Sequence, residues 1–267
     1  MSKDVIIGLF SEIKERQPLI HHLTNNVTIN DCANVTLAIG GSPVMATSIE
    51  EVSDMVQLAN ALVINFGTID QRMYEAMILA GQTANSKGIP VVFDPVGVGA
   101  TRFRTERAKD FLRKVKVNIV RGNATEVFAL VGGKAITRGV DAGELTVSRD
   151  ELALKAADKL QAIIVISGEY DVISNGKRSV QIENGDIWLT KITGTGCMTA
   201  SLIACFASVT NDCFAAAVAG MSVMSVAGEN AKNKLDTNDG IGTYRMKLMD
   251  EIFLMTAGIW EKGVRLK

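Results

Sequence analysis

Short apolar runs alternate with longer amphipathic segments over the first two thirds of this 267-residue chain. The runs are rich in β-branched residues and indicate strands at 19–22, 43–46, 61–66, 90–94, 117–120 and 162–168. Between them, apolar residues recur every three or four positions, as in 49–59, 73–80 and 153–160, which is typical of amphipathic helices. Strands that alternate with helices pair in parallel, and continuously apolar strands are buried on both faces. We therefore expect an α/β fold with a mostly parallel central sheet and helices on both faces.

Two segments depart from this alternation. Residues 171–183 carry Asn175-Gly176 between two short strand-like runs, which predicts a hairpin and an antiparallel edge. From residue 193 onward the pattern is almost entirely helical. Because no Pro/Ser-rich linker, internal repeat or low-complexity tract interrupts the chain, we expect residues 1–267 to form a single domain.

The composition excludes some classes of protein. Hydrophobic residues make up 47% of the chain, enough for a large core without disulfides or metals, and the net charge is −1. That charge argues against binding to nucleic acid or to a membrane surface, because both need a basic patch. The first residues lack the apolar region and cleavage site of a signal peptide. The uncharged stretch 192–211 predicts a buried helix rather than a membrane span.

The four cysteines have neither CxxC nor zinc-ligand spacing. Cys205 and Cys213 fall in apolar helical sequence and are expected in the core. Free thiols in this pattern fit a reducing compartment, so we expect a cytoplasmic protein.

Residues 193–197, with the sequence TGTGC, lead directly into the long apolar run. The two glycines allow a tight turn and the close approach of another molecule. Cys197 then falls in the first turn of the expected helix, where unpaired N–H groups and the helix dipole favour a phosphate and a thiolate. The alternative is a glycine-rich loop before a core helix with a buried cysteine.

Ligands in parallel sheets of this kind bind beyond the carboxyl ends of the strands. The residues directly after the expected strands are 24–26 (TNN), Met45, 65–67 (NFG), 94–99 (DPVGVG), 121–123 (RGN) and 167–169 (SGE). These positions are rich in Asn, Gly and single charges, so we expect the ligand site at this edge. Met45 is either a core residue or an apolar contact to a ligand, and the sequence leaves both open.

Asp94, Arg121 and Glu126 are the charged candidates at this edge. Asp94 ends a strand beside a glycine-rich loop, which suits Mg²⁺ held beside phosphates, although an Asp there can also bond to its own turn. Arg121 has the planar charged fork that binds phosphate oxygens. Asn123 and Glu126 approximate a capping box, and the functional alternative is that Glu126 faces a metal through water.

Several other chemistries lack their motifs. The sequence has no GxSxG, HExxH or GxxxxGK[ST] segment, and no GxGxxG follows the first expected strand. This argues against a serine-hydrolase elbow, a zinc protease, a P-loop enzyme and a dinucleotide site. The only histidines, His21 and His22, are expected at a strand end with one side chain buried and the other exposed.

Taken together, the motifs resemble the hydroxyethylthiazole kinase family of the ribokinase-like superfamily. The stretches that carry the resemblance are LTNNVTINDCANVTLAIGGSPVMA, VVFDPVGVGATRFRT, RGNATEVFAL, ISGEYDVI, TGTGCMTASLIACF and NDGIGTYRMKLMDEIF. They run in order through most of the chain. The resemblance implies a three-layer α/β/α fold and Mg²⁺-dependent transfer of phosphate from ATP to the hydroxyl of 4-methyl-5-(2-hydroxyethyl)thiazole. It also implies a homotrimer with active sites at the subunit interfaces.

The resemblance also implies roles for individual positions. Met45 and Gly194 match substrate contacts, and Asn25 lies in the stretch that lines the thiazole pocket. Arg121 and Ser167 match ATP contacts. The metal-side acids correspond to Asp94 and Glu126, and Asn123 with Glu126 forms the Asn-x-x-Glu pattern of the superfamily.

Cys197 stands where many ribokinase-like enzymes carry an aspartate that acts as the base for the substrate hydroxyl. A thiolate could accept the proton, but a loose phosphoryl-transfer transition state needs little help from a base. Positioning and the backbone N–H groups of residues 194–197 are the alternative source of catalysis.

Three other functions stay open at this point. The nearest is a ribokinase-like kinase of another small alcohol, such as hydroxymethylpyrimidine or pyridoxal. A second is a catalytically silent member that binds thiazole or nucleotide as a sensor. A third is an ATP-dependent repair or dehydratase enzyme on the same fold.

Overall fold

The computed structural model describes residues 3–133 and 147–267. The strands are β1 (Leu19–Leu23), β2 (Ser42–Val44), β3 (Ala61–Asn65), β4 (Val91–Asp94), β5 (Ile119–Asn123), β6 (Ile163–Ser167), β7 (Asp171–Ser174) and β8 (Ser179–Ile182). The helices are α1 (Lys3–Arg16), α2 (Ile29–Ile39), α3 (Val52–Leu58), α4 (Gln71–Lys87), α5 (Arg102–Lys114), α6 (Ala124–Leu130), α7 (Arg149–Leu160), the 3-10 helix η1 (Ile187–Lys191), α8 (Thr195–Ala207), α9 (Cys213–Asn233), α10 (Ile241–Phe253) and α11 (Ala257–Gly263).

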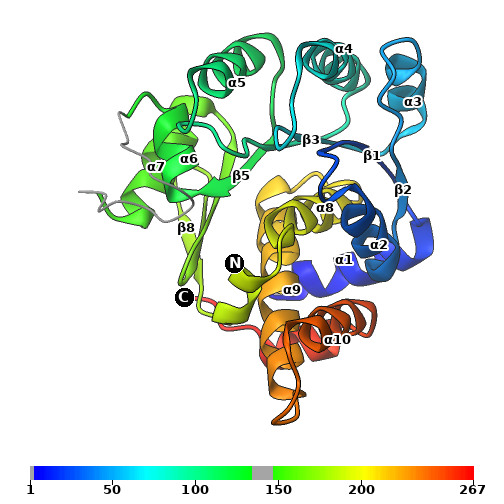
Figure 1. The fold of residues 1–267 in the computed structure, drawn as a ribbon, viewed down its shortest axis with the longest axis vertical. Helices are drawn as coiled ribbons and strands as arrows, with labels where there is room; N and C mark the ends of the chain where they lie inside the picture. Colours follow the sequence, from blue (N-terminus) through cyan, green and yellow to red (C-terminus); the bar gives the residue numbers. More distant parts are fainter. Residues whose placement is uncertain (1–2, 134–146) are drawn as a thin grey trace.

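The eight strands form one sheet in the order β2-β1-β3-β4-β5-β6-β7-β8. Strands β1 to β6 pair in parallel, and β7 and β8 add an antiparallel hairpin at one edge. Helices α3 to α7 lie on one side of the sheet, whereas α1, α2, α8 and α9 lie on the other, with α10 beyond α9 (Figure 1). The expected three-layer α/β fold and the antiparallel hairpin are therefore confirmed.

Hydrophobic side chains form one buried cluster on each face of the sheet. In β3, Val63 faces the α8–α9 cluster, and its neighbours Leu62 and Ile64 face the α3–α7 cluster. Successive side chains of a strand point to opposite faces, so a strand covered on both sides must be apolar throughout. This is why the continuous apolar runs predicted the central strands well.

The first edge of the sheet differs from the prediction. β2 ends at Val44, before Met45, and none of its three residues is fully buried. α3 begins at Val52, after a turn in which Ser48 O accepts from Glu51 N, rather than at residue 49. Val52 and Val56 are buried as the spacing predicted. The observed bounds of β2 and α3 differ from the predicted ones because a short edge strand contacts only one neighbouring strand, so its sequence carries a weak apolar pattern.

The expectation that one of the two histidines is exposed is wrong, since His21 and His22 are both fully buried. Helices α8 and α3 pack against β1 from opposite sides of the sheet, so both faces of this strand are covered. The ring of His21 bonds through Nε2 to Ala46 O at 2.6 Å, and His22 Nε2 bonds to Ser201 Oγ at 3.1 Å. Burial lowers the pKa of both imidazoles, that of His22 to about 4, so both are neutral at pH 7.

The apolar C-terminal helices are buried within the protein. The expected buried helix after residue 197 is α8, in which every residue from Met198 to Ala207 is buried. Among the residues that the structure describes, no helix is long and apolar enough to cross a membrane. Cys205 lies in the core as expected, whereas Cys213 is only half-buried because it begins α9.

Candidate active site

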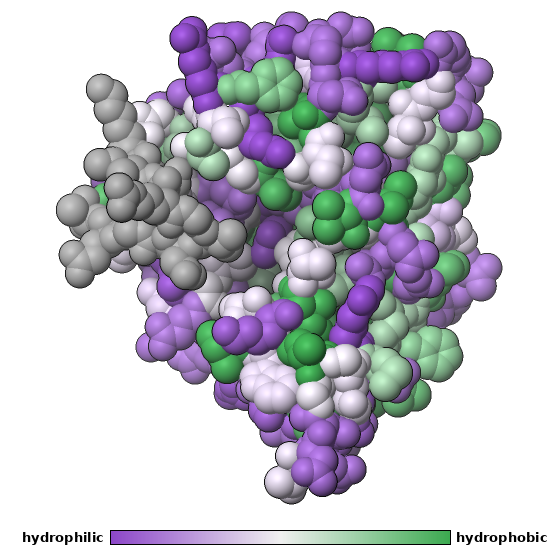
Figure 2. All heavy atoms as spheres, in the orientation of Figure 1, coloured by the Kyte–Doolittle hydropathy of each residue, from purple (hydrophilic) through white to green (hydrophobic). Residues whose placement is uncertain are grey.

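The parallel strands bring the predicted polar residues to one edge of the sheet. Asn65 and Asp94 end β3 and β4 and pair directly in the strand register, and Ser167 ends β6 opposite Asn123 of β5. The start of α8 faces the same edge, because α8 packs against β3 and β4. Figure 2 shows a hollow near the middle of this face, with polar side chains in it and apolar ones beside it.

Four side chains from four separate elements form one hydrogen-bonded group at this edge. Asn25 Nδ2 donates to Asn65 Oδ1 at 2.9 Å, and Asn65 Nδ2 donates to Asp94 Oδ2 at 2.8 Å. Both amides also donate to Cys197 Sγ, each at 3.3 Å. The group connects the end of β1, the ends of β3 and β4, and the first turn of α8. Asn25, Asp94 and Cys197, which the sequence analysis named separately, therefore lie together.

Asp94 is completely buried, and its two carboxylate oxygens differ. Oδ2 accepts the Asn65 amide, whereas Oδ1 has no hydrogen-bond partner within the described residues and lies 4.0 Å from Arg121 Nη1. Burial raises the pKa of Asp94 to about 7, with Arg121 opposing the rise and Glu126 adding to it. A buried acceptor without a partner is costly, so Oδ1 is suited to a cationic or donor ligand.

Arg121 lies beside the first turn of α8. Its Nη2 donates to Ser167 Oγ at 2.9 Å, so the two residues assigned to ATP contact each other. A Cβ built on Gly196 would come within 2.9 Å of Arg121 Cζ, which shows how closely the guanidinium approaches the helix backbone. The Arg121 side chain is 13% exposed, and its buried Nε has no partner among the described residues.

Glu126 and Asn123 form the capping box that the sequence predicted. Glu126 N donates to Asn123 Oδ1 at 2.8 Å, and Asn123 N donates to Glu126 Oε2 at 2.9 Å. The other carboxylate oxygen, Oε1, accepts from Gly97 N at 2.8 Å. Glu126 therefore fixes the loop after Asp94 to the start of α6. Each of its oxygens retains further acceptor capacity, so a water-mediated metal contact stays a prediction.

Cys197 is the third residue of α8, as predicted, but the structure does not favour a thiolate there. Burial and the nearby Asp94 carboxylate raise the pKa of its thiol, and this outweighs the bonds from Thr28 and Asn25 and the charge of Arg121. The expectation from helix position alone is wrong because it takes no account of desolvation. Cys197 is a half-buried neutral thiol at pH 7.

Gly194 caps α8 in the left-handed conformation, with φ of +91°. A Cβ at this position would lie 2.6 Å from Thr28 Cγ2, so the turn requires glycine for both conformation and space. Met45 is half-buried directly after β2, next to Ala46, whose carbonyl accepts from His21 Nε2. That Met45 and Gly194 contact the substrate stays a prediction.

Sequence reasoning did not select Asn65 or Asp171 as site residues. Asn65 was visible only as one of several residues after a strand. Asp171 begins β7, is buried, and accepts from Gly168 N at 3.1 Å and from Ser225 Oγ at 2.9 Å. Burial raises the pKa of Asp171 to about 6. No sequence signal distinguishes a buried aspartate of this kind from an exposed turn residue.

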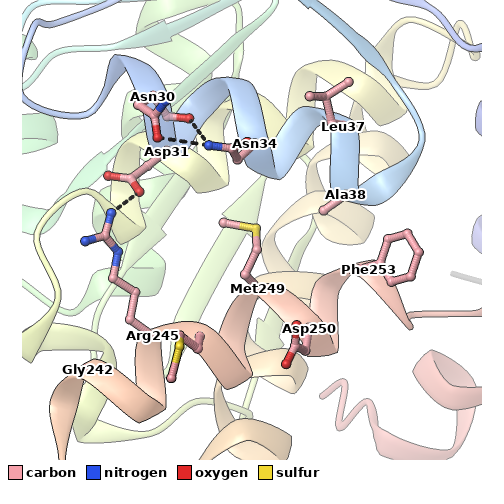
Figure 3. Close-up of a pocket in the computed structure, with 11 residues that line it drawn as sticks. Asn30, Asp31, Asn34, Leu37, Ala38, Gly242, Arg245, Met249, Asp250 and Phe253 are labelled. Atoms are coloured by element: carbon pink, nitrogen blue, oxygen red, sulfur yellow. Dashed lines mark hydrogen bonds and ion pairs between the residues drawn. The ribbon is translucent and has the colours of Figure 1, made fainter.

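A groove of about 670 Å³ lies between α2 and α10. Its lining residues are Asn30, Asp31, Asn34, Leu37, Ala38, Gly242, Arg245, Met246, Met249, Asp250 and Phe253. Figure 3 shows Arg245 of α10 reaching across to an ion pair with Asp31 of α2, above Met249. Phe253 is 68% exposed at the far end of the groove. Asp31 also lies close to Gly194, so the groove begins beside the candidate active site.

Known proteins are similar to this chain in sequence and in fold. The model of the hydroxyethylthiazole kinase family matches residues 10–258. A hydroxyethylthiazole kinase from Ruminiclostridium cellulolyticum is 46% identical, over 98% of this chain and 96% of its own. A second relative, from Clostridioides difficile, is also 46% identical, over 97% of this chain and 98% of its own. The structure of hydroxyethylthiazole kinase protein from Pyrococcus horikoshii aligns with a TM-score of 0.88 at 32% identity, covering 99% and 98%.

More distant structures share the fold alone. A pyridoxal kinase from Staphylococcus aureus aligns with a TM-score of 0.59 at 15% identity, over 83% of this chain and 89% of its own. An ADP/ATP-dependent NAD(P)H-hydrate dehydratase from Bacillus subtilis aligns with a TM-score of 0.63 at 16% identity, over 93% and 91%.

Proposed function

The chain belongs to the hydroxyethylthiazole kinase family, and we infer that it transfers phosphate from ATP to the hydroxyl of 4-methyl-5-(2-hydroxyethyl)thiazole, a step of thiamine biosynthesis or salvage. The observation that supports this most strongly is the group formed by Asn25, Asn65, Asp94 and Cys197 beside Arg121. In this group a carboxylate oxygen that has no hydrogen-bond partner among the described residues lies beside a guanidinium and a helix N-terminus. Phosphoryl transfer needs these parts, because its catalysis is mostly positioning and charge stabilisation.

The nucleotide side of the site consists of Arg121, Ser167 and the start of α8. The guanidinium and the first N–H groups of α8 supply positive charge for the phosphates of ATP. Ser167 Oγ holds the guanidinium in place through the 2.9 Å bond. In this arrangement a side chain at position 196 would displace Arg121, because the guanidinium occupies the space next to Gly196.

The residues present suit Mg²⁺. Asp94 Oδ1 is a buried carboxylate oxygen without a partner in the described part of the chain, which is the donor type that Mg²⁺ prefers. The described residues hold no cluster of three His, Cys, Asp or Glu, but Mg²⁺ on a nucleotide needs only one or two carboxylates. Asp94 and Glu126 would hold the ion, and it would neutralise charge that develops on the phosphates.

The substrate side consists of Asn25, Met45, Gly194 and Cys197. The neutral Cys197 thiol contacts the hydroxyl of the thiazole and positions it at the start of α8. A loose transition state develops little charge on the attacking oxygen, so a strong base is not required. Backbone N–H groups at residues 194–197 stabilise the transferred phosphoryl group.

The competing functions have less support. The pyridoxal kinase and the dehydratase share the fold at 15% and 16% identity, whereas the hydroxyethylthiazole kinases from Ruminiclostridium cellulolyticum and Clostridioides difficile are each 46% identical to this chain. A sensor would use the same ligand contacts, so phosphate transfer in the assay below is what separates it from the kinase.

We place the substrate assay first among the tests. The chain is incubated with ATP and Mg²⁺ and with the thiazole, hydroxymethylpyrimidine or pyridoxal, and phosphorylated product is measured by mass. Phosphate on the thiazole alone supports the proposal. Preferential transfer of phosphate to hydroxymethylpyrimidine or pyridoxal would instead identify the chain as a ribokinase-like kinase of that alcohol. ATP binding without transfer to any of the three would support the sensor, and ATP hydrolysis without transfer would support the dehydratase.

The same proposal includes a homotrimer with active sites at the subunit interfaces, and the groove between α2 and α10 is the candidate contact with a second copy. The groove is rimmed by exposed apolar side chains, with Leu37 at 57%, Met246 at 64% and Phe253 at 68% exposure. Exposed apolar surface of this kind marks association sites. It also continues from Asp31 towards Gly194, so a copy seated there would reach the substrate side.

Light scattering on Phe253→Glu tests the trimer. The variant should fall to monomer mass, and Leu58→Glu should not, although Leu58 is equally exposed at 68% on the opposite side of the sheet. Trimer mass for the α10 variant would argue against this groove as the interface.

A further inference from the structure

Asn65 has no assigned role, yet the hydrogen-bonding capacity of its side chain is fully used at the site. It is buried at the end of β3, with 1% exposure. Its Nδ2 donates to Asp94 Oδ2 at 2.8 Å and to Cys197 Sγ at 3.3 Å. Its Oδ1 accepts from Asn25 Nδ2 at 2.9 Å and from Gly67 N at 2.8 Å. An amide has two donor hydrogens and two acceptor lone pairs, and all four are used here.

This bonding permits one orientation of the amide. A rotation by 180° would place Oδ1 against the Asp94 carboxylate and the NH₂ group against Gly67 N–H. Both contacts would then be repulsive in a buried site. The surrounding groups therefore fix the orientation of the Asn65 amide. The amide in turn orients the two groups that accept its hydrogens, Asp94 and Cys197.

The first of those acceptors is Asp94, and the effect on its carboxylate is unequal. Oδ2 is occupied by the amide, which leaves Oδ1 as the oxygen facing Arg121, 4.0 Å from Nη1. Without the Asn65 donor, the carboxylate could turn about χ2 and present either oxygen, or the edge between them. Asn65 thus determines which oxygen of Asp94 faces the phosphates.

The second acceptor is Cys197, which comes from α8. Strand pairing fixes Asn65 beside Asp94, whereas α8 is held to these strands by packing and, at its first turn, by the hydrogen bonds of Asn65 and Asn25 to Cys197 Sγ. The shared amide links the nucleotide-side carboxylate to the residue beside the substrate hydroxyl. On this geometry we propose that Asn65 is a positioning residue, which orients Asp94 and sets the placement of Cys197 relative to it for phosphoryl transfer. The inference rests on the proposed kinase function.

Loss of this alignment should lower kcat rather than substrate affinity. Misplacement of reacting groups by about 1 Å can cost roughly 100-fold in rate. We expect kcat to fall by about 100-fold, with the KM values for ATP and thiazole within about threefold, since Arg121 and Ser167 still hold the nucleotide.

Two nearly isosteric variants make the test robust to misfolding. Asn65→Leu removes all four bonds. Asn65→Asp retains the oxygen that accepts from Asn25 and Gly67 and replaces the NH₂ group, with its two donor hydrogens, by an oxygen that carries at most one. The control is Asn85→Ala, whose amide also joins two segments, through Lys116 O at 2.8 Å and Lys116 N at 2.7 Å, but at the opposite end of the sheet. Asn85→Ala should leave kcat unchanged even if it lowers Tm.

Each variant is also made in an Asp94→Asn background, with single turnovers followed using γ-labelled ATP. If Asn65 acts through Asp94, its substitution should cost less than about threefold in that background, because coupled residues are not additive. An equal loss in both backgrounds would overturn the proposal, as would a loss carried only by KM. A wild-type chain that transfers no phosphate would refute the kinase function itself. A fully active chain with fully active Asn65 variants would refute this inference alone.

Discussion

Gly196 and Arg121 form a close contact between the backbone of α8 and a guanidinium from β5. A Cβ on Gly196 would lie 2.9 Å from Arg121 Cζ and 3.0 Å from Nη2. Arg121 therefore lies over the first turn of the helix, where backbone N–H groups lack intrahelical partners. Since Ser167 Oγ bonds the same guanidinium at 2.9 Å, the position of the cation is fixed from two sides. This contact makes the helix start and Arg121 a single anion-binding unit.

Gly196→Ala should weaken ATP binding without destabilising the fold. Alanine is favoured over glycine in a helix by up to about 1 kcal/mol, which offsets the loss of the Arg121–Ser167 bond, so Tm should change little. The added methyl group should displace the guanidinium from Ser167 and raise the Kd for ATP about tenfold, the lower range for losing a charge-assisted contact. Titration calorimetry and thermal unfolding measure the two effects. An unchanged Kd would show that Arg121 binds the nucleotide equally well from another position.

Arg121→Ala should cost about 1.5–3 kcal/mol of nucleotide binding, because a charge-assisted phosphate contact is lost. Arg121→Lys retains the charge without the planar fork and should fall between wild type and Arg121→Ala. Arg113→Ala is the control, because Arg113 is a surface residue of α5 with 74% side-chain exposure. If the alanine variant keeps both its KM for ATP and its turnover, Arg121 does not belong to the site.

The sequence predicted the central sheet because strands covered on both faces must be apolar throughout. It also predicted that Asn25, Asp94, Arg121 and Ser167 meet, since parallel strands end at one edge. It could not predict that Asn65 joins Asp94 to Cys197. The sequence shows an asparagine after a strand, but not how many hydrogen bonds its side chain makes. The thiolate expectation for Cys197 was wrong for a related reason: helix position is visible in sequence, whereas desolvation depends on what packs around the thiol.

Cys197→Ser tests whether the thiol is a base. Burial and Asp94 raise the pKa of the Cys197 thiol, so little thiolate is present at pH 7 to accept a proton. Serine preserves a small donor and acceptor at the same place, where Asn25 and Asn65 donate. We expect kcat within about tenfold of wild type. General-base catalysis is worth roughly 100- to 10,000-fold, so a loss of that size in steady-state turnover would assign Cys197 as the base.

Asp171 links the turn after β6 to α9, and its titration should affect stability. Burial raises the pKa of Asp171 to about 6, compared with an ordinary aspartate value of 3.8. The folded state therefore binds more protons than the unfolded state between these two values. By linkage, the stability associated with the protonated carboxyl is complete below about pH 4 and is lost as pH rises through about 6. Ionisation of this carboxyl opposes folding at neutral pH, although Gly168 N and Ser225 Oγ both donate to it.

Asp171→Asn removes this titration, so the pH dependence of stability that Asp171 causes should disappear in the variant. The free energy of unfolding of the variant, relative to wild type, should rise between pH 4 and pH 6.5 by up to roughly 3 kcal/mol, the linkage value of the pKa difference. Ser225 Oγ can accept from the new amide while it donates to Met221 O, as it does at 3.2 Å. Urea unfolding at several pH values measures the change. Asp158→Asn, an exposed carboxyl on α7, is the control. If the difference in free energy of unfolding between variant and wild type stays constant with pH, Asp171 is already ionised throughout this range.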